Sequence, residues 1–340
     1  MQFETESLNR MGREVSGFVD YLTEALTVKT GITKTYKNVL ICGMGASAIG
    51  GAVFADSTYY TSKVYVDVTK ALSIPVWVTK EDTLFVACSY SGNTFETVKM
   101  YKLAVESGLD VIAVTHGGEL ESLSAQNGNL IVKIGGELMQ PRSAIGWFVG
   151  LLGGIIEDAG VTGLRKQLED MIPRLRAYQD EMEAEDSYAR YVAKRIVGYV
   201  PVVYGSPDLS ATAVRMKNQL NENSKIVAFS GTMPEFNHNE VVGWYEDPLR
   251  KNFLPIIIND DDLTDVRKIV KATISTLKSR GLDPIIVDVK GESVSERIIY
   301  AIMFGDYVSL FLAANRKVDP CNVDPIVDIK TRMKASLDQE

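Results

Sequence analysis

Residues 84–94 read Leu-Phe-Val-Ala-Cys-Ser-Tyr-Ser-Gly-Asn-Thr. The apolar run at their start is typical of a strand that is buried on both faces of a parallel sheet. Three hydroxyl side chains, Ser89, Ser91 and Thr94, follow where this strand ends, and a helix is predicted to begin near Thr94. Ligands of open parallel sheets bind at the carboxyl ends of the strands. The stretch therefore predicts a doubly wound α/β domain with a polar binding site at that edge.

Short apolar runs separated by helical segments recur on both sides of this stretch. They lie at 39–42, 64–68, 111–115 and 130–134 in the first half, and at 199–204, 226–229, 254–258 and 285–289 in the second. Such βαβ alternation predicts parallel sheets covered by helices on both faces. We expect two α/β domains, residues 1–158 and residues 159–340, each an αβα sandwich with a mainly parallel sheet. The second domain would begin with a charged, helical linking segment.

Composition and charge narrow the class of protein. The 340 residues are 46% hydrophobic and 24% charged, enough apolar content for two ordinary cores. A net charge of −8 argues against nucleic acid or an anionic membrane as the partner. Three cysteines without a CxxC pair suit a reducing compartment, and the first residues lack the apolar core of a signal peptide. We therefore expect a cytoplasmic protein that binds a small molecule.

A second glycine-rich turn follows an earlier strand, where residues 39–51 read Val-Leu-Ile-Cys-Gly-Met-Gly-Ala-Ser-Ala-Ile-Gly-Gly. Gly45 allows close backbone approach, and Ser47 lies where a helix is predicted to begin, so both would face a bound anion. A dinucleotide-binding turn is the alternative. It is weakened because no third glycine is in register, although Asp67 is near enough to keep it open.

The hydroxyl cluster predicts a phosphate site. Ser89, Ser91 and Thr94, with the backbone N–H groups around Gly92 and the positive end of a helix, would hold a phosphate dianion without a lysine. The alternative is an ordinary turn with a helix cap. A cap would account for Thr94 but not for all three hydroxyls together with the glycine.

Several motifs resemble one family of enzymes. The segment SYSGNTFET is similar to the phosphate-binding signature of sugar isomerase (SIS) domains. GMGASAIGG, PRSAIGW, NENSK and PEFNHNEVVGW together resemble the archaeal-type bifunctional phosphoglucose/phosphomannose isomerases, and the resemblance covers nearly the whole chain. It implies two SIS domains and a metal-independent aldose–ketose isomerase without a cofactor. The substrates would be glucose 6-phosphate, and also mannose 6-phosphate, converted to fructose 6-phosphate through a cis-enediol.

Moving a proton between C1 and C2 requires a carboxylate base and a cation beside the developing enediolate oxygen. By the resemblance, Glu222 in NENSK is the base and Arg142 in PRSA stabilises the enediolate. From the residues alone, Glu222 would be a surface glutamate at a helix end. Arg142 would equally be a surface arginine that flanks a helix.

The remaining expected roles concern ring opening and a lysine from the C-terminal tail. The resemblance implies that His238 opens the sugar ring and reaches the active site of a neighbouring subunit, hence a homodimer. It also implies a lysine from the C-terminal tail, where Lys330 matches and Lys317 is the rival. His116 is interpreted as a turn residue, and two histidines exclude a histidine-rich metal site. A non-catalytic SIS regulator and an NAD-linked enzyme remain as alternatives.

Overall fold

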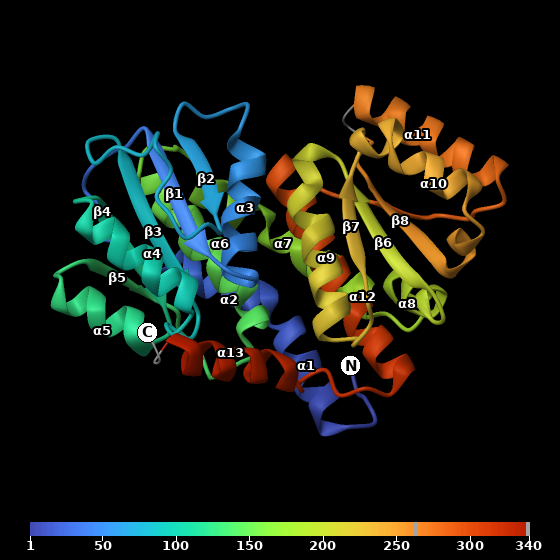
Figure 1. The fold of residues 1–340 in the computed structure, drawn as a ribbon, viewed down its shortest axis with the longest axis horizontal. Coiled ribbons are helices and arrows are strands. Elements are labelled where there is room, and N and C mark those ends of the chain that lie inside the picture. Colours follow the sequence, from blue (N-terminus) through green and yellow to red (C-terminus); the bar gives the residue numbers. More distant parts are fainter. Residues whose placement is uncertain (262–263, 338–340) are drawn as a thin grey trace.

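Two parallel sheets lie at opposite ends of the molecule, with helices packed between them (Figure 1). The computed structural model describes residues 1–261 and 264–337. The first half contains α1 Glu6–Ser16, α2 Phe18–Leu26, β1 Asn38–Gly43, α3 Ala46–Thr58, β2 Tyr65–Thr69, β3 Thr83–Ser89, α4 Phe95–Glu106, β4 Asp110–Thr115, α5 Gly118–Gln126, β5 Leu130–Lys133, the 3₁₀ turn η1 Pro141–Ala144 and α6 Ile145–Asp158.

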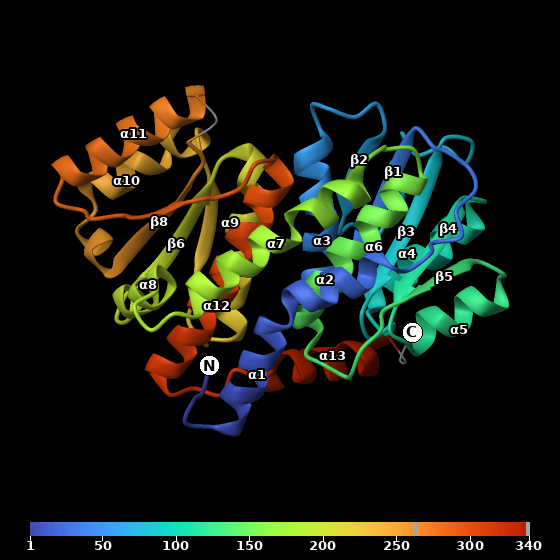
Figure 2. The same cartoon turned by 180° about the vertical axis from the view of Figure 1, so that it is seen from behind.

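The second half repeats this alternation. It contains α7 Leu164–Glu183, α8 Tyr188–Ile196, β6 Val200–Gly205, η2 Pro207–Leu209, α9 Ser210–Glu222, β7 Phe229–Thr232, η3 Glu235–His238, α10 Glu240–Glu246, η4 Pro248–Asn252, β8 Phe253–Asn259, α11 Thr264–Ser279, β9 Ile285–Asp288, α12 Val294–Arg316 and α13 Asp324–Leu337. Helix α13 runs beneath the first sheet in both views (Figures 1 and 2).

Both sheets are parallel throughout, which confirms the expected fold class. The first has the order β2-β1-β3-β4-β5 and the second the order β7-β6-β8-β9. In the first sheet the strand order reverses between β1 and β3, whose ends are aligned because Gly43 pairs with Cys88. A crevice opens at such a switch point. The two polar turns identified in the sequence therefore lie side by side at this edge.

The core between the sheets is built on two apolar helices. In α6, residues 145–156 are all buried. The helix lies so close to α2 that a Cβ on Gly146 would come within 2.4 Å of the Phe18 carbonyl oxygen, so only glycine fits there. Helix α12 is long and apolar enough to cross a membrane by length and composition. However, 89% of its most apolar window is buried inside the protein, which is typical of a core helix.

Helices α3 and α9 bring the two halves together and run in opposite directions. The start of α9 contacts the end of α3, because the Ala211 N–H donates to the Asp56 carboxylate at 3.3 Å. The end of α9 therefore lies beside the start of α3, where η1 also packs. As a result, Glu222 at the end of α9 faces the carboxyl edge of the first sheet.

One strand boundary was predicted wrongly. The strand expected at 226–229 begins only at Phe229 and continues to Thr232. Lys225 adopts a left-handed conformation with φ of 55°, which turns the chain sharply after α9. The next three residues lead from this turn to the sheet without joining its hydrogen-bond ladder. Their apolar character alone had suggested a strand.

Candidate active site

Arg142 is buried between the two halves and makes hydrogen bonds to three neutral oxygens. It belongs to η1, and only 5% of its surface is exposed. Its Nε donates to Asn223 Oδ1 at 2.7 Å, its Nη1 to Gln140 Oε1 at 3.1 Å and its Nη2 to the Pro320 carbonyl oxygen at 2.6 Å. The alternative interpretation, that Arg142 is a surface residue flanking a helix, is therefore wrong.

Glu222 is the last residue of α9, and its carboxylate faces Arg142. The distance from Glu222 Oε2 to Arg142 Nη1 is 3.6 Å. The Glu222 side chain is 29% exposed, so its carboxylate is accessible to solvent, whereas the guanidinium of Arg142 is buried beneath it. Burial lowers the pKa of Arg142, and the negative charge of Glu222 is the largest influence in the opposite direction. An arginine stays protonated even so. The structure thus brings together the two groups to which the resemblance gave the central chemistry.

Lys225 fastens the end of α9 to the C-terminal tail. Its Nζ donates to the backbone carbonyl of Glu222 and, at 3.2 Å, to that of Pro320. Burial lowers the pKa of Lys225, and the nearby charge of Arg142 lowers it further. The Pro320 carbonyl therefore accepts from both cations. The hydrogen bonds of Arg142 and Lys225 to Pro320 hold the start of the C-terminal tail, from which α13 runs toward the first sheet.

The hydroxyl cluster forms a compact loop at the carboxyl end of β3. Ser89 Oγ and Thr94 Oγ1 lie 2.9 Å apart, and Ser89 Oγ also accepts from the Gly92 N–H at 3.1 Å. The Asn93 N–H donates to Ser91 Oγ at 3.3 Å. Thr94 precedes α4, but its side chain makes no capping hydrogen bond. The first N–H groups of α4 are therefore left for a ligand rather than for Thr94.

Two glycines shape this site. Gly92 has φ of 68°, and a Cβ there would lie 1.7 Å from the Gly117 carbonyl oxygen. Gly45 has φ of 56° and precedes α3, with nothing within 4 Å of where its Cβ would be. Ser47 lies in the first turn of that helix and is 6% exposed. Both turns thus present the start of a helix to the same edge of the sheet.

The structure distinguishes the two lysine candidates. Lys330 is on α13 and lines a cavity of about 840 Å³ together with Asn93, Thr94 and Phe95, next to the hydroxyl cluster. Lys317 ends α12 in a left-handed conformation and lines a different cavity with the first residues of the chain. Of these two candidates, Lys330 is therefore the one that shares a cavity with residues of the hydroxyl cluster; Lys99 and Lys102 line the same cavity.

His238 does not reach Glu222 within one chain. Glu222 lies before the start of β7, whereas His238 ends η3, which follows the far end of that strand. Figure 1 shows α10, which begins two residues after His238, far from α13. His238 is also exposed to solvent. The other histidine, His116, stacks on Tyr90 with ring centroids 5.2 Å apart, and its Nδ1 is 3.1 Å from the Ile134 carbonyl oxygen, as suits a structural turn residue.

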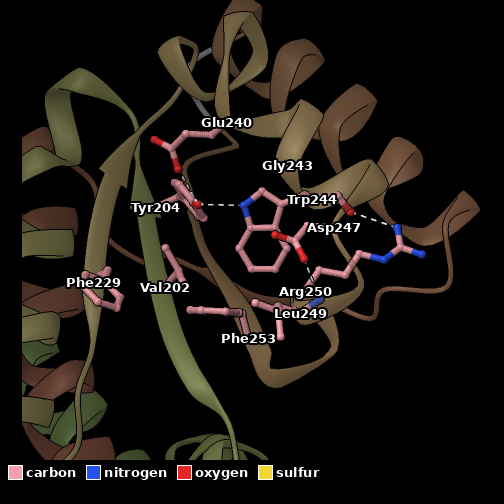
Figure 3. Close-up of a pocket in the computed structure, with 10 residues that line it drawn as sticks. All are labelled: Val202, Tyr204, Phe229, Glu240, Gly243, Trp244, Asp247, Leu249, Arg250 and Phe253. Carbon is pink, nitrogen blue, oxygen red and sulfur yellow. Dashed lines mark hydrogen bonds between the residues drawn. The ribbon is translucent and has the colours of Figure 1, made fainter.

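A separate pocket of about 410 Å³ lies near His238, between β6, β7 and α10 (Figure 3). At its edge the Trp244 indole donates to the Tyr204 hydroxyl at 3.0 Å, and that hydroxyl donates to Glu240 at 2.8 Å. No residue predicted for the site lines this pocket. Apolar side chains are exposed on and around it, namely Val227, Phe229, Val242 and Leu249.

The dinucleotide alternative loses its support in the structure. Asp67 lies in the middle of β2 rather than at its end, where the acidic residue of a ribose site would be.

Among residues 1–261 and 264–337, no three His, Cys, Asp or Glu side chains are grouped as metal ligands would be.

Sequence reasoning missed the residues that hold Arg142 in place. Gln140 and Asn223 lie in the QPRS and NENSK segments, but nothing in the sequence shows that both accept hydrogen bonds from Arg142. Pro320 acts through its backbone carbonyl, which no side-chain pattern reveals. Their proximity to Arg142 and Glu222 within these motifs was the only available signal.

The chain is similar in sequence to several known proteins. Residues 185–333 match the model of the bacterial phospho-glucose isomerase C-terminal SIS domain. The bifunctional phosphoglucose/phosphomannose isomerase of Aquifex aeolicus is 33% identical over 88% of this chain and 91% of its own. The enzyme of that name from Thermoplasma acidophilum is 36% identical with the same coverage. A D-glucosamine-6-phosphate 4-epimerase of Sulfolobus acidocaldarius is 30% identical over 74% of this chain and 76% of its own.

Solved structures share the fold at low sequence identity. A hypothetical protein of Thermus thermophilus has a TM-score of 0.73 at 17% identity, covering 98% of this chain and 91% of its own. Tagatose-6-phosphate ketose/aldose isomerase of Escherichia coli has a TM-score of 0.69 at 15% identity, covering 94% and 96%. These likenesses support the architecture of two parallel sheets.

Proposed function

This chain belongs to the family of bifunctional phosphoglucose/phosphomannose isomerases, and from this premise we propose that it interconverts glucose 6-phosphate, and also mannose 6-phosphate, with fructose 6-phosphate. It is an aldose–ketose isomerase. Its reaction would serve glycolysis or gluconeogenesis. The contact between Glu222 and Arg142 is the observation that carries this proposal.

Glu222 is the base in this proposal. Its carboxylate takes the proton from C2 of the open-chain aldose and returns it to C1, so the intermediate is a cis-enediol with negative charge on oxygen. Arg142, which is buried beneath Glu222, stabilises that negative charge because its guanidinium stays protonated. A fixed cation beside the oxygen supplies the stabilisation that a metal ion provides in other isomerases. We therefore expect no metal requirement.

The phosphate group is anchored at the carboxyl edge of the first sheet. Ser47, Ser89, Ser91 and Thr94 supply hydroxyls, and the turns at Gly45 and Gly92 expose backbone N–H groups at two helix starts. Lys330 lies on α13 beside Thr94 and adds a positive charge to this edge. Fixing the phosphate places the other end of the sugar toward Glu222.

Ring opening requires a proton donor, and His238, to which the resemblance gives this role, does not reach Glu222 within one chain. We propose a homodimer in which His238 of the partner subunit supplies it. The separation of His238 and Glu222 within one chain supports this arrangement, as do the exposed apolar side chains of the second half, namely Val227, Phe229, Val242 and Leu249. The free cysteines support a cytoplasmic location.

A direct assay tests the proposed function. The wild type and Glu222→Gln are incubated with fructose 6-phosphate in the presence of EDTA, and glucose 6-phosphate and mannose 6-phosphate are measured separately. We expect both products from the wild type and a loss of several orders of magnitude in the variant. No turnover by folded wild type would contradict the isomerase and favour a non-catalytic regulator. In a parallel incubation with glucosamine 6-phosphate, turnover of that sugar alone would favour a 4-epimerase.

A further inference from the structure

A closed ring of buried hydrogen bonds surrounds Arg142 and ties it to the second half of the chain. Arg142 Nε donates to Asn223 Oδ1 at 2.7 Å, and Asn223 Nδ2 donates to Ser309 Oγ at 2.9 Å. Ser309 Oγ donates to the backbone carbonyl of Asp306 at 2.7 Å. The Asp306 carboxylate pairs with Arg215, and Arg215 Nη2 donates to the Arg142 carbonyl at 2.9 Å.

All members of this ring are almost completely buried. The exposed fractions are 5% for Arg142, 0% for Asn223 and Ser309, 4% for Asp306 and 2% for Arg215. A buried charge without a partner is costly, so each arginine needs acceptors for its donors. The two arginines meet this requirement in different ways.

Arg215 is held by a carboxylate, whereas the hydrogen-bond acceptors of Arg142 are all neutral oxygens. The Asp306 carboxylate accepts from Arg215 Nε at 2.9 Å and from Nη2 at 2.6 Å, a two-point ion pair. The acceptors of Arg142 are the amide oxygens of Gln140 and Asn223 and a backbone carbonyl. In the part of the chain that the structure describes, Glu222 is the carboxylate that forms an ion pair with Arg142, and it does so at 3.6 Å.

We propose that Asn223 is a positioning residue that holds Arg142 through a neutral oxygen, so that the charge of the guanidinium remains available to the enediolate. This inference rests on the proposed function. A preorganised charge stabilises a transition state most when no fixed anion cancels it, and Glu222 loses its own negative charge as it takes the proton from the substrate. Asn223 is suited to the task because its amide both accepts from Arg142 and donates to Ser309. An aspartate would accept from the arginine but would neutralise it.

Two substitutions at one position distinguish charge from anchoring. Asn223→Asp keeps the shape and anchors Arg142 with a stronger, charge-assisted bond, whereas Asn223→Ala removes the anchor and adds no charge. We expect kcat to fall about 100-fold in Asn223→Asp, with little change in KM, and to fall by no more than that in Asn223→Ala. If Asn223 only anchored Arg142, kcat would fall more in Asn223→Ala than in Asn223→Asp, because the aspartate anchors Arg142 at least as well.

The experiment measures kcat and KM for fructose 6-phosphate in the wild type, both variants and Ser309→Ala. Ser309→Ala is the matched control, because aspartate at 223 also loses its donor bond to Ser309. We expect the control to keep kcat within a few-fold of the wild type. Melting temperatures show that each variant is folded. An anionic hydroxamate analogue of the enediolate should lose more affinity for Asn223→Asp than fructose 6-phosphate does.

The outcomes separate this inference from the proposed function. Wild-type turnover with kcat nearly unchanged in Asn223→Asp would overturn the inference and leave the isomerase intact. A kcat lower in Asn223→Ala than in Asn223→Asp would also overturn it. The absence of wild-type turnover would overturn the isomerase and, with it, the positioning role of Asn223.

Discussion

Glu222 Oε2 and Arg142 Nη1 lie 3.6 Å apart, although the two residues come from opposite halves of the chain. Glu222 ends α9 of the second half, and Arg142 belongs to η1 of the first. The carboxylate is partly exposed and the guanidinium is buried, so a substrate would reach the proposed base, Glu222, before the guanidinium. Any change in the packing of the two halves would alter this distance and the chemistry with it.

The proposed phosphate site should depend on the backbone at Gly92. Gly92→Ala forces an L residue into φ of 68° and places its Cβ 1.7 Å from the Gly117 carbonyl oxygen. The left-handed conformation alone costs roughly 1–2 kcal/mol, and the clash adds to it. We expect lower stability in urea unfolding and a raised KM for fructose 6-phosphate. Gly128→Ala is the matched control, because Gly128 has φ of 67° and nothing within 4 Å of the added Cβ. Equal effects of the two changes would contradict the prediction.

The two tail lysines should differ in their effect on substrate binding. Lys330→Met removes a charge next to Thr94, whereas Lys317→Met removes one from a distant cavity. We expect KM for fructose 6-phosphate to rise about tenfold for Lys330→Met, which corresponds to about 1.4 kcal/mol, and to change little for Lys317→Met. Steady-state kinetics of both variants check this. A larger rise for Lys317→Met would reverse the assignment.

Mixed dimers test whether His238 works across an interface. Glu222→Gln and His238→Ala are each expected to be nearly inactive with glucose 6-phosphate. In a mixed dimer, one site receives Glu222 from one subunit and His238 from the other, and both are intact. Random exchange in an equal mixture should therefore restore up to about a quarter of wild-type activity. Mixtures no more active than their components would show that each site uses its own histidine or none.

Stability should depend on the protonation of Asp56, which joins α3 to α9. Burial raises the pKa of Asp56 to about 7, above its ordinary value of 3.8. The folded state thus favours the protonated form, and this contribution is present below pH 4 and is lost as the pH rises to about 7. Asp56→Asn mimics the protonated form and keeps an acceptor for Ala211. We expect Asp56→Asn to have a higher free energy of unfolding than the wild type, and the difference to be larger at pH 8 than at pH 4.5, as measured by urea unfolding. An advantage that does not depend on pH would contradict this.

The sequence allowed the architecture and the individual motifs to be predicted. Buried parallel strands have near-continuous apolar runs, and the glycine and hydroxyl turns follow them directly, so residues 84–94 located the edge of the sheet. Strand ends were less predictable where the backbone turns unexpectedly, as at Lys225, whose φ of 55° delays β7. An apolar side chain such as Ile226 does not show whether its backbone joins a ladder.

The convergence of Arg142 and Glu222 could not be derived from spacing. They are far apart in the sequence and meet only because α3 and α9 run in opposite directions between the sheets. The resemblance to a family predicted that Arg142 and Glu222 act at one site, and the packing of α3 against α9 explains how they meet. The neutral acceptors of Arg142 were beyond prediction, because Pro320 contributes a backbone atom and Asn223 contributes through a ring that spans both halves.

The most direct test of the central claim, proton transfer by Glu222 through an enediol, is isomerisation in D₂O. Glucose 6-phosphate formed from fructose 6-phosphate is analysed by NMR for deuterium at C2, for the wild type and for Glu222→Gln. The account predicts deuterium at C2 in the wild-type product and neither turnover nor exchange above background in the variant. Turnover or deuterium exchange by Glu222→Gln at a rate near that of the wild type would contradict the account, whereas hydrogen retained at C2 in part of the wild-type product reflects direct transfer of the proton by Glu222.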